Sequence, residues 1–464
     1  MASNIKLFFN FAVLLKNRMK KFLSFAFIIF IGSLIKAQEN PKILYLDTLE
    51  SWNLHYQFTS ANQYHPTFHA LYSGTNSLKP GEEEAMSVTS TLFYGQRLWN
   101  GAVFYVNPEI AGGKGMSSAL GIAGYPNGEC FRIADATPAL YAARYFLHQH
   151  IALSNEGYEK TDDDENSIKD RIPAKRVTIT AGKFSLADVF DNNAYAHNSR
   201  EQFMNWALME SGAWDFAANT RGYDYGIAVE LIYPSWAFRL AGSAVPKVAN
   251  GPDLEFKFNK AVAYNCEFEY KPDLFSRQGS IRVLFFRNLS RAGNYLNAIN
   301  NFKNGTDTSL NVNSLSTYGG KKVGLSLSAD QGLFKNFGVF IRAGWNDGHY
   351  ATWAFTEIDR SFSTGINLDG DMWHRKDDNI GLALAINGIS DDHIKFLNAG
   401  GYGFIIGDGK LTHYGLESII EFYYLMKIST FLYLTADYQF VNNPAYNKDR
   451  GPVNIFALRM HTEF

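Results

Sequence analysis

The most regular feature of the chain is an alternation of apolar and polar side chains over short segments. In residues 52–59 every even position is apolar or aromatic, and every odd position is polar. Residues 262–270 and 456–464 show the same alternation with small departures. A period of two is that of a β-strand, whose successive side chains point to opposite faces. The pattern therefore predicts strands with one apolar face and one polar face.

About sixteen such segments follow one another, and an even number returns both termini to the same side of a closed sheet. Their predicted spans are 52–59, 86–98, 101–108, 139–151, 175–184, 222–233, 235–245, 260–270, 279–290, 321–330, 336–346, 360–368, 378–388, 412–426, 429–441 and 453–464.

The connections between these segments alternate between short and long. The short ones include 99–101, 234–235, 271–273, 332–335 and 427–428, and the long ones include 60–85, 109–138, 185–221, 291–320 and 389–411. Outer-membrane barrels have this parity, with short periplasmic turns and long external loops. The exception is 152–174, a long acidic insertion where a short turn belongs. Either that turn is elaborated or the strand count shifts there.

Two details favour a membrane barrel over a half-buried sheet in water. The polar faces carry small and charged residues, as a water-filled lumen requires, and the apolar faces often begin or end in an aromatic residue. In lipid every backbone polar group must be paired, so the sheet has to close. The predicted fold is all-β, a transmembrane antiparallel β-barrel of about sixteen strands, wide enough for an aqueous channel. The final residue, Phe464, falls on the lipid phase of the last strand.

Composition agrees with this fold without deciding it. The 464 residues are 15% aromatic, with 39 Gly and only 13 Pro, which suits a large soluble β-protein equally well. The two cysteines, Cys130 and Cys266, form no disulfide framework and have no neighbours at metal-ligand spacing. The sequence therefore predicts no cofactor and no metal.

The N-terminal segment has the features of a secretory signal peptide. Lys20 and Lys21 precede an apolar run over 22–35, and Ala37 is a suitable last residue before cleavage. The expected division is a signal peptide at 1–37 and a barrel domain at 38–464; a retained anchor is the alternative. Cleavage removes six basic residues and no acidic ones, moving the formal net charge from −2 to −8. Such a protein is a poor nucleic-acid binder, and the expected location is the outer membrane.

Short motifs along the chain resemble the carbohydrate-selective porins of the OprB type. They are 94–102 (YGQRLWNGA), 107–109, 112–115, 124–129 with Arg132, 141–144, 342–348, 353–361, 387–390 with His393, 400–403, 437–439 and 443–447. Each motif is short, and their order over nearly the whole mature chain is the more specific feature. The resemblance implies a barrel of about this strand number whose pore admits monosaccharides and similar small sugars.

A sugar channel needs a polar constriction that replaces part of the solute's hydration. Forked donors and carboxylates serve paired hydroxyls, and aromatic faces cover the sugar's C–H surface. The candidate substrate-binding residues are Arg97, Glu109, Asn127, Glu129, Arg132, Arg144, Arg239, Arg342, Asp347, Glu357 and Arg360.

These candidates come from several patterns. Arg97 and Glu109 lie near the ends of neighbouring strands, and Asp347, Glu357 and Arg360 bracket an external loop. Arg144, Arg239, Arg282 and Arg342 share the lumen phase and suggest a basic ladder, for which an ordinary wall of charge pairs is the alternative. The Gly-rich loop 109–138 is expected to fold inward. Trp206 and Trp214, in the loop 185–221, and Trp353 are candidate stacking faces or interfacial anchors; Trp345 falls on the outward phase, which favours anchoring.

The predicted function is passive diffusion of sugars through the barrel, without catalysis. A nonspecific porin is the nearest alternative. A barrel enzyme would need a nucleophile and a base on the wall, and no Gly-x-Ser-x-Gly motif singles one out. A secreted soluble sugar-binding or sugar-cleaving protein is the third. The expected partners are small sugars and outer-membrane lipid; monomer and trimer both stay open.

Overall fold

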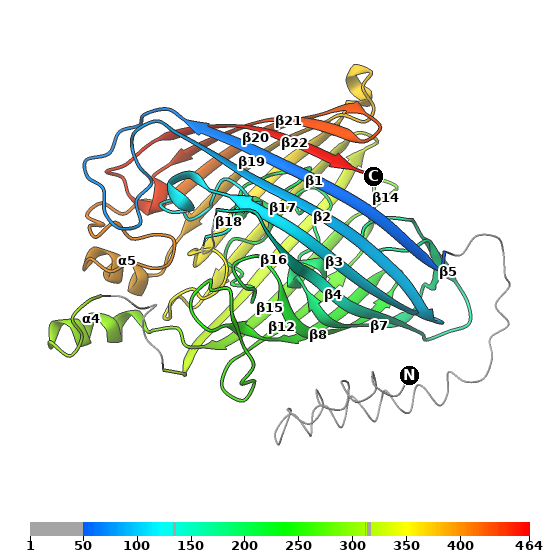
Figure 1. Cartoon of the computed structure of the whole chain (residues 1–464), viewed down its shortest axis with the longest axis horizontal. Coiled ribbons are helices and arrows are strands. Elements are labelled where there is room, and N and C mark those ends of the chain that lie inside the picture. The colour runs from blue at the N-terminus through cyan, green and yellow to red at the C-terminus, as the bar shows by residue number, and fades with distance from the viewer. Residues whose placement is uncertain (1–49, 133–135, 311, 313–316) are drawn as a thin grey trace. The chain divides into compact units, whose positions relative to one another are not determined.

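One closed antiparallel barrel contains most of the strands. The computed structural model describes residues 50–132, 136–310, 312 and 317–464. Within these residues, sixteen strands pair in chain order, and the sheet closes where β1 (Trp52–His65) pairs with β22 (Val453–Glu463) (Figure 1). The predicted fold class and strand number are confirmed. The proposed signal peptide at 1–37 lies outside the described residues.

Each predicted segment coincides with one barrel strand. The largest differences are at the external ends, where β1 runs to residue 65 rather than 59, β3 runs to 113 rather than 108, and β20 begins at 417 rather than 412. There the alternation does not predict where a strand ends, because the strand extends beyond the lipid and its outer face no longer has to be apolar. The remaining barrel strands are β2 (Glu83–Trp99), β3 (Ala102–Gly113), β4 (Ala139–Ala152), β7 (Arg176–Phe184), β8 (Asp224–Tyr233), β9 (Trp236–Ser243), β12 (Val262–Tyr270), β15 (Ser280–Ser290), β16 (Gly320–Phe334), β17 (Phe337–Asn346), β18 (Arg360–Asp369), β19 (Asn379–Gly388), β20 (Glu417–Ser429) and β21 (Leu432–Asn442).

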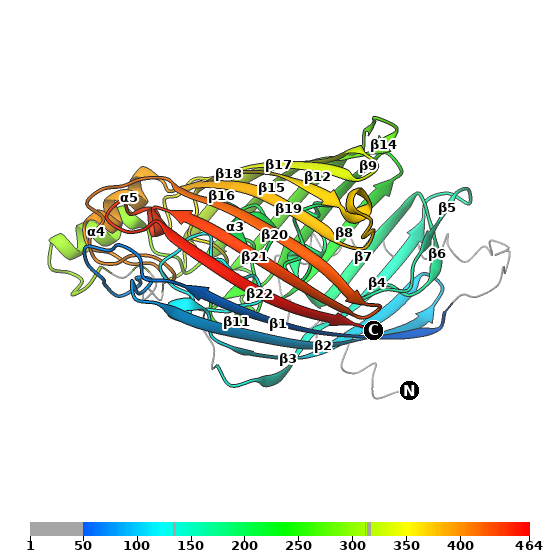
Figure 2. The same ribbon diagram turned by 90° about the horizontal axis from the view of Figure 1, so that it is seen from above.

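The connections keep the predicted parity of short turns and long loops. The insertion at 152–174 forms a hairpin of β5 (Tyr158–Thr161) and β6 (Asp170–Pro173) at the short-turn end, so the strand count does not shift (Figure 2). The other small elements are β10 (Val245–Pro246), β11 (Leu254–Glu255), β13 (Asp273–Leu274), β14 (Arg277–Gln278), α3 (Trp206–Met209), α4 (Tyr295–Lys303), α5 (Asp391–Asn398) and the 3-10 turns η1 (Met116–Ser118), η2 (Leu186–Asp188), η3 (Gly370–Trp373) and η4 (Pro444–Tyr446).

The two faces of the wall differ sharply in chemistry. On β20, Ile420 is 43% exposed on the outside while Glu421 is fully buried on the inside, and Leu458 and Arg459 on β22 repeat this contrast. A contiguous outer belt of exposed aliphatic side chains is suited to acyl chains rather than water. Phe464, 64% exposed, belongs to the same outer surface. Among the described residues, no helix has the length and apolar character needed to cross a bilayer.

Candidate functional site

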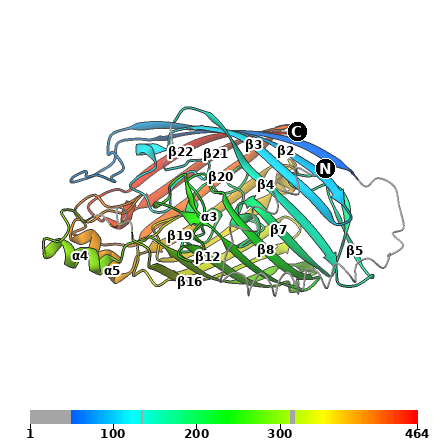
Figure 3. The same cartoon turned by 60° about the horizontal axis from the view of Figure 1, so that its bottom comes forward.

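The segment between β7 and β8, residues 185–223, folds into the barrel and carries α3 with it (Figure 3). We call this segment the inner loop. It is held by wall strands that are far apart around the sheet. Arg342 on β17 donates from Nε to Asp191 at 3.0 Å, and Arg459 on β22 donates to the carbonyl of Ser199 at 2.7 Å. The inner loop therefore crosses the lumen rather than lying against one side.

Wall carboxylates anchor the inward segments by accepting backbone amide hydrogens. Glu421 accepts from Met204 at 2.5 Å and from Asn205 at 3.1 Å. Glu417 accepts from Ala123 at 3.0 Å and from Gly124 at 2.7 Å, so this part of the loop 114–138 also lies inside, in agreement with the inward fold expected for 109–138. These hydrogen bonds replace those to water, which the crowded lumen excludes.

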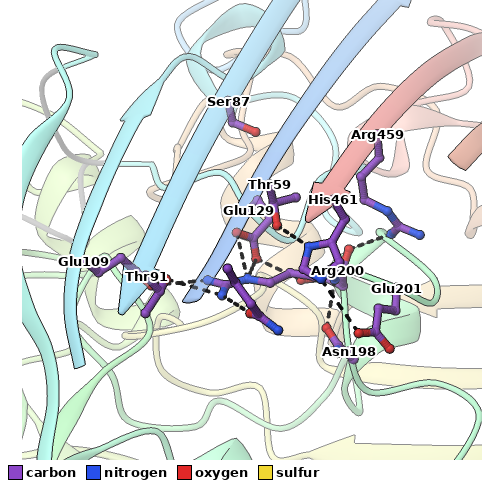
Figure 4. A network of polar contacts seen from close by, with 12 residues as sticks. Thr59, Ser87, Thr91, Glu109, Glu129, Asn198, Arg200, Glu201, Arg459 and His461 are labelled. Atoms are coloured by element: carbon purple, nitrogen blue, oxygen red, sulfur yellow. Dashed lines mark hydrogen bonds and ion pairs between the residues drawn. The ribbon is translucent and has the colours of Figure 1, made fainter. Parts of the chain in front are cut away.

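The two inward segments enclose a cavity of about 110 Å³ at the external side of the lumen. Arg200 of the inner loop lies between two carboxylates there, 3.2 Å from Glu109 on β3 and 3.2 Å from Glu129 of loop 114–138 (Figure 4). Burial opposes the charge of Arg200, but these carboxylates hold its pKa above the usual value. Burial likewise opposes the charge of Glu129, and Arg200 nevertheless holds the pKa of that carboxyl below its usual range.

Aromatic rings make up much of the remaining cavity wall. Arg221 lies over the ring of Tyr141 at 4.0 Å and over that of Phe131 at 4.7 Å. Trp206 is stacked on Phe355 with ring centroids 5.7 Å apart. A cation above an aromatic face is a favourable contact that also fixes the direction of the guanidinium donors. The site therefore combines flat apolar faces with forked donors and carboxylates.

Three predicted site residues belong to this cavity or support it. Glu109 and Glu129 line it. Asn127 is buried behind them, where its side chain donates to Ser87 and its carbonyl accepts from Trp206 at 2.8 Å. These contacts make Asn127 a positioning residue for the loop and for the stacked tryptophan.

The predicted basic ladder is paired with acids along its whole length. Arg239 lies 2.9 Å from Glu267 and 2.7 Å from Glu269. Arg282 is 2.9 Å from the same Glu269. Arg342 faces Asp191, as described above. The arrangement along this wall is that of charge pairs, the alternative raised by the sequence.

The fourth ladder member, Arg144, lies closer to the cavity. Its guanidinium forms two hydrogen bonds to Asp188, at 2.6 and 2.8 Å, and lies 4.9 Å above the ring of Tyr223, a cavity residue. Arg144 therefore orients a cavity wall rather than presenting its own donors.

The other predicted residues are not brought together with this cavity. Arg97 pairs with Asp170 of the β5–β6 hairpin at 2.7 Å, at the opposite end of the barrel. Arg132 donates to the carbonyl of Phe404 at 2.8 Å. Arg360 is exposed on the same outward phase as Phe362.

Glu357 and Asp347 belong to the external cap of the barrel. Glu357 is fully buried and accepts amide hydrogens from Ile405 at 2.7 Å and Ile406 at 2.8 Å, so it joins two external loops. Burial raises the pKa of its carboxyl. The backbone amide of Asp347 donates to Val323 on β16, which extends the strand pairing by one residue.

Comparison with known proteins identifies the architecture. The sequence pattern of the carbohydrate-selective porin, OprB family, matches residues 94–464. The chain belongs to this family. OprB of Pseudomonas putida, in a high-pH structure, aligns with a TM-score of 0.64 at 15% identity, covering 89% of this chain and 94% of that one. The channel DcaP of Acinetobacter baumannii aligns with a TM-score of 0.49 at 8% identity, covering 90% and 99%. No curated protein matches the chain.

The porin is thus a channel of the outer membrane, and the predicted location is confirmed. Several cavity residues of this porin were missed from the sequence. Three of them lie in the inner loop, where an alternation of period two does not predict which way a side chain points: Arg200, Arg221 and Tyr223. The fourth, Tyr141, lies on β4 outside the strict alternation. The available signal was the size of that loop together with its clustered aromatic and basic residues.

The candidate tryptophans of the porin have different surroundings. Trp206 lines the cavity. Trp214 is fully buried and donates to Asn265 at 3.0 Å, and Trp353 is buried with its indole donating to the carbonyl of Pro246. Trp345 is 49% exposed on the outer face, as its phase indicated.

Proposed function

We propose that the cavity between the inner loop and loop 114–138 is the sugar-binding constriction of this porin. Monosaccharides and similar small sugars would pass through it by passive diffusion. The family model supports carbohydrate as the class of solute. The cavity chemistry supports the same class, because aromatic faces, forked donors and carboxylates are what several hydroxyls on a C–H skeleton require.

Arg221 carries the proposal. Its guanidinium is held between the rings of Tyr141 and Phe131, and its buried Nη1 has no hydrogen-bond partner among the described residues. A buried donor without a partner is costly unless a solute or water completes it. Glu109 lines the same cavity, where its carboxylate accepts from Arg200 and Tyr223 and so fixes the positions of these two side chains.

The test is single-channel recording of the refolded, untagged protein in planar bilayers, with glucose added as a blocker of the ion current. We expect dose-dependent block by glucose and little block by a neutral solute of similar size that lacks a ring of hydroxyls. Arg221→Gln should weaken the block about tenfold, roughly the loss of one charge-assisted hydrogen bond. Arg360→Gln removes an arginine from the outer face and is the matched control.

The nonspecific porin predicts a different result. In that case glucose and the control solute would reduce the current only in proportion to their size, and Arg221→Gln would leave both effects unchanged. Hydrolysis of ester, peptide or glycoside substrates by the purified protein would instead favour a barrel enzyme.

A further inference from the structure

A second group of polar side chains lies on the short-turn side of the inner loop, one residue along the chain from Arg200. His461 and Glu463 are two residues apart on β22 and therefore share its inward face. Glu201 of the inner loop lies beside His461 (Figure 4). One ligand atom from each of the three residues lies within 4.8 Å of the other two.

The separations in this group are longer than hydrogen bonds. His461 Nε2 is 3.8 Å from Glu201 Oε1 and 3.7 Å from Glu463 Oε2. Ligands of a tetrahedral zinc ion with bonds of about 2.1 Å lie about 3.4 Å apart. The two separations from His461 are within a few tenths of an ångström of that value, and the two carboxylates lie within 4.8 Å of each other. It therefore suits three ligands around one small cation.

The histidine is oriented for this role by its other nitrogen. His461 Nδ1 lies 2.8 Å from the hydroxyl of Thr59 on β1, and both residues are buried. A proton on Nδ1, donated to Thr59, leaves the lone pair of Nε2 directed at the two carboxylates. His461 is 0% exposed, and its Nε2 has no hydrogen-bond partner among the described residues. Metal-binding histidines are commonly oriented by a hydrogen bond at the second ring nitrogen.

The surroundings favour a cation. Glu463, together with Asp164 of the β5–β6 hairpin, acts electrostatically on Glu201, adding negative charge. Arg459 is the opposing charge on the same face of β22. It directs one nitrogen to the carbonyls of Ser199 and Gln202, at 2.7 and 2.8 Å, while also acting electrostatically on Glu201. Lys427 acts in the same sense on Glu463, so the carboxylates are only partly balanced by longer-range positive charge.

The group is also accessible from the short-turn mouth. Glu201 and Glu463 line a cavity of about 350 Å³ that is bounded by residues 376–378, which connect β18 to β19, and by the first residue of β19. Their side chains are 39% and 35% exposed. An ion can therefore reach them, and water has room to complete its coordination.

We propose that Glu201, His461 and Glu463 form a binding site for one divalent transition-metal ion of the zinc class. One imidazole and two carboxylates suit zinc, manganese or iron(II) better than calcium or magnesium, which prefer oxygen alone. Because Glu201 belongs to the inner loop and the other two ligands to the last strand, the bound ion links the loop to the wall at the periplasmic mouth. It also places positive charge in the conduction path.

The test uses the untagged, folded full-length barrel in detergent, with ZnCl₂ as the titrant in calorimetry. We expect one Zn²⁺ per chain. His461→Gln and Glu201→Gln should each weaken binding at least about tenfold. Asp377→Asn is the matched control, because Asp377 is an exposed acid of the same cavity that is not one of the three proposed ligands. The affinity of this variant for Zn²⁺ should equal that of the wild type. Heat-modifiable migration verifies folding of every variant.

Two further readouts separate a metal site from an ion pair. With CuCl₂ as the probe, electron paramagnetic resonance should show coupling to one imidazole nitrogen that His461→Gln abolishes. In planar bilayers, Zn²⁺ should lower cation conductance more strongly from the short-turn side. Absence of stoichiometric Zn²⁺ binding would overturn the proposal. So would binding that Asp377→Asn weakens as much as Glu201→Gln, since that would be general attraction of counterions.

Discussion

Arg342 and Asp191 face each other at 3.0 Å, with both side chains only 1% exposed. One belongs to the barrel wall and the other to the inner loop, and the guanidinium also donates to the carbonyl of Leu208 at 2.6 Å. A buried pair of this kind is fully desolvated, so removing one partner leaves an uncompensated charge. This contact holds the inner loop in place.

The first prediction concerns that contact. Arg342→Met should lower the free energy of unfolding by about 3–5 kcal/mol and increase the open-channel noise, because Asp191 stays buried without its partner. Urea unfolding in lipid vesicles measures the first effect and bilayer recording the second. The double variant Arg342→Met/Asp191→Asn should regain most of the loss. If it is no more stable than the single variant, the pair is not what anchors the loop.

The second prediction concerns ion selectivity. Glu109→Gln removes one negative charge beside Arg200, so the permeability ratio of K⁺ to Cl⁻ should fall by about two- to fivefold. Reversal potentials across a KCl gradient measure this ratio. Glu156→Gln, an exposed acid on the β4–β7 connection, is the control and should leave the ratio within about 20% of wild type. An unchanged ratio in Glu109→Gln would place the conduction path elsewhere.

The third prediction concerns acid stability of the external cap. Burial disfavours the charge of Asp359, yet Lys322 and hydrogen bonds from His393 and Ser390 hold the pKa of its carboxyl well below the usual 3.8. A lowered folded pKa contributes stability that is fully present above the unfolded value and is lost as the pH falls through the folded one.

We therefore expect α5 to stay docked on Asp359 between pH 7 and pH 4 and to loosen only below about pH 3. Hydrogen exchange of the 391–398 amides, corrected for intrinsic rates, measures this docking. Asp359→Asn should reduce protection at every pH and abolish the acid step. An acid step that persists in Asp359→Asn would assign it to another carboxyl.

The fourth prediction concerns the β5–β6 hairpin. Ile168 is 2% exposed, and its amide donates to the hydroxyl of Tyr105 on the barrel wall. Ile168→Ala should weaken docking of the hairpin by about 2–4 kcal/mol, because it removes buried methyl groups and leaves a cavity. Limited proteolysis within 152–174 measures the loosening. Leu153→Ala, at a 45% exposed position nearby, should leave cleavage rates unchanged.

The strands were predictable because lipid and water impose opposite demands on neighbouring positions. Ile420 and Glu421 are neighbours in the chain, yet the first faces lipid and the second faces the polar lumen. The choice of an apolar and then a polar residue therefore records in the sequence which face each side chain occupies. The inner loop meets no such requirement. Arg200 reaches Glu109 across 91 residues of chain, and no local pattern encodes a contact over that separation.

The predicted site residues show the same division. Glu109 was found by its place at the end of a predicted strand and in the resembling motif 107–109, and Glu129 was found through the resemblance and its inward loop. Arg360 was drawn into the candidates by sequence position near a conspicuous loop, yet its side chain is on the outer phase of β18. Arg221 was missed because only the folded inner loop places it between two rings.

The anchors of the inner loop also bear on how the barrel is assembled. Two of them, Glu421 and Arg459, belong to β20 and β22, which are synthesised long after residues 185–223. The loop therefore cannot acquire its full set of contacts until the final strands arrive and the seam between the first and last strands is sealed. Closure of the barrel and formation of its constriction are therefore one step of assembly. An intermediate whose first and last strands are still unpaired would have a lumen without the constriction.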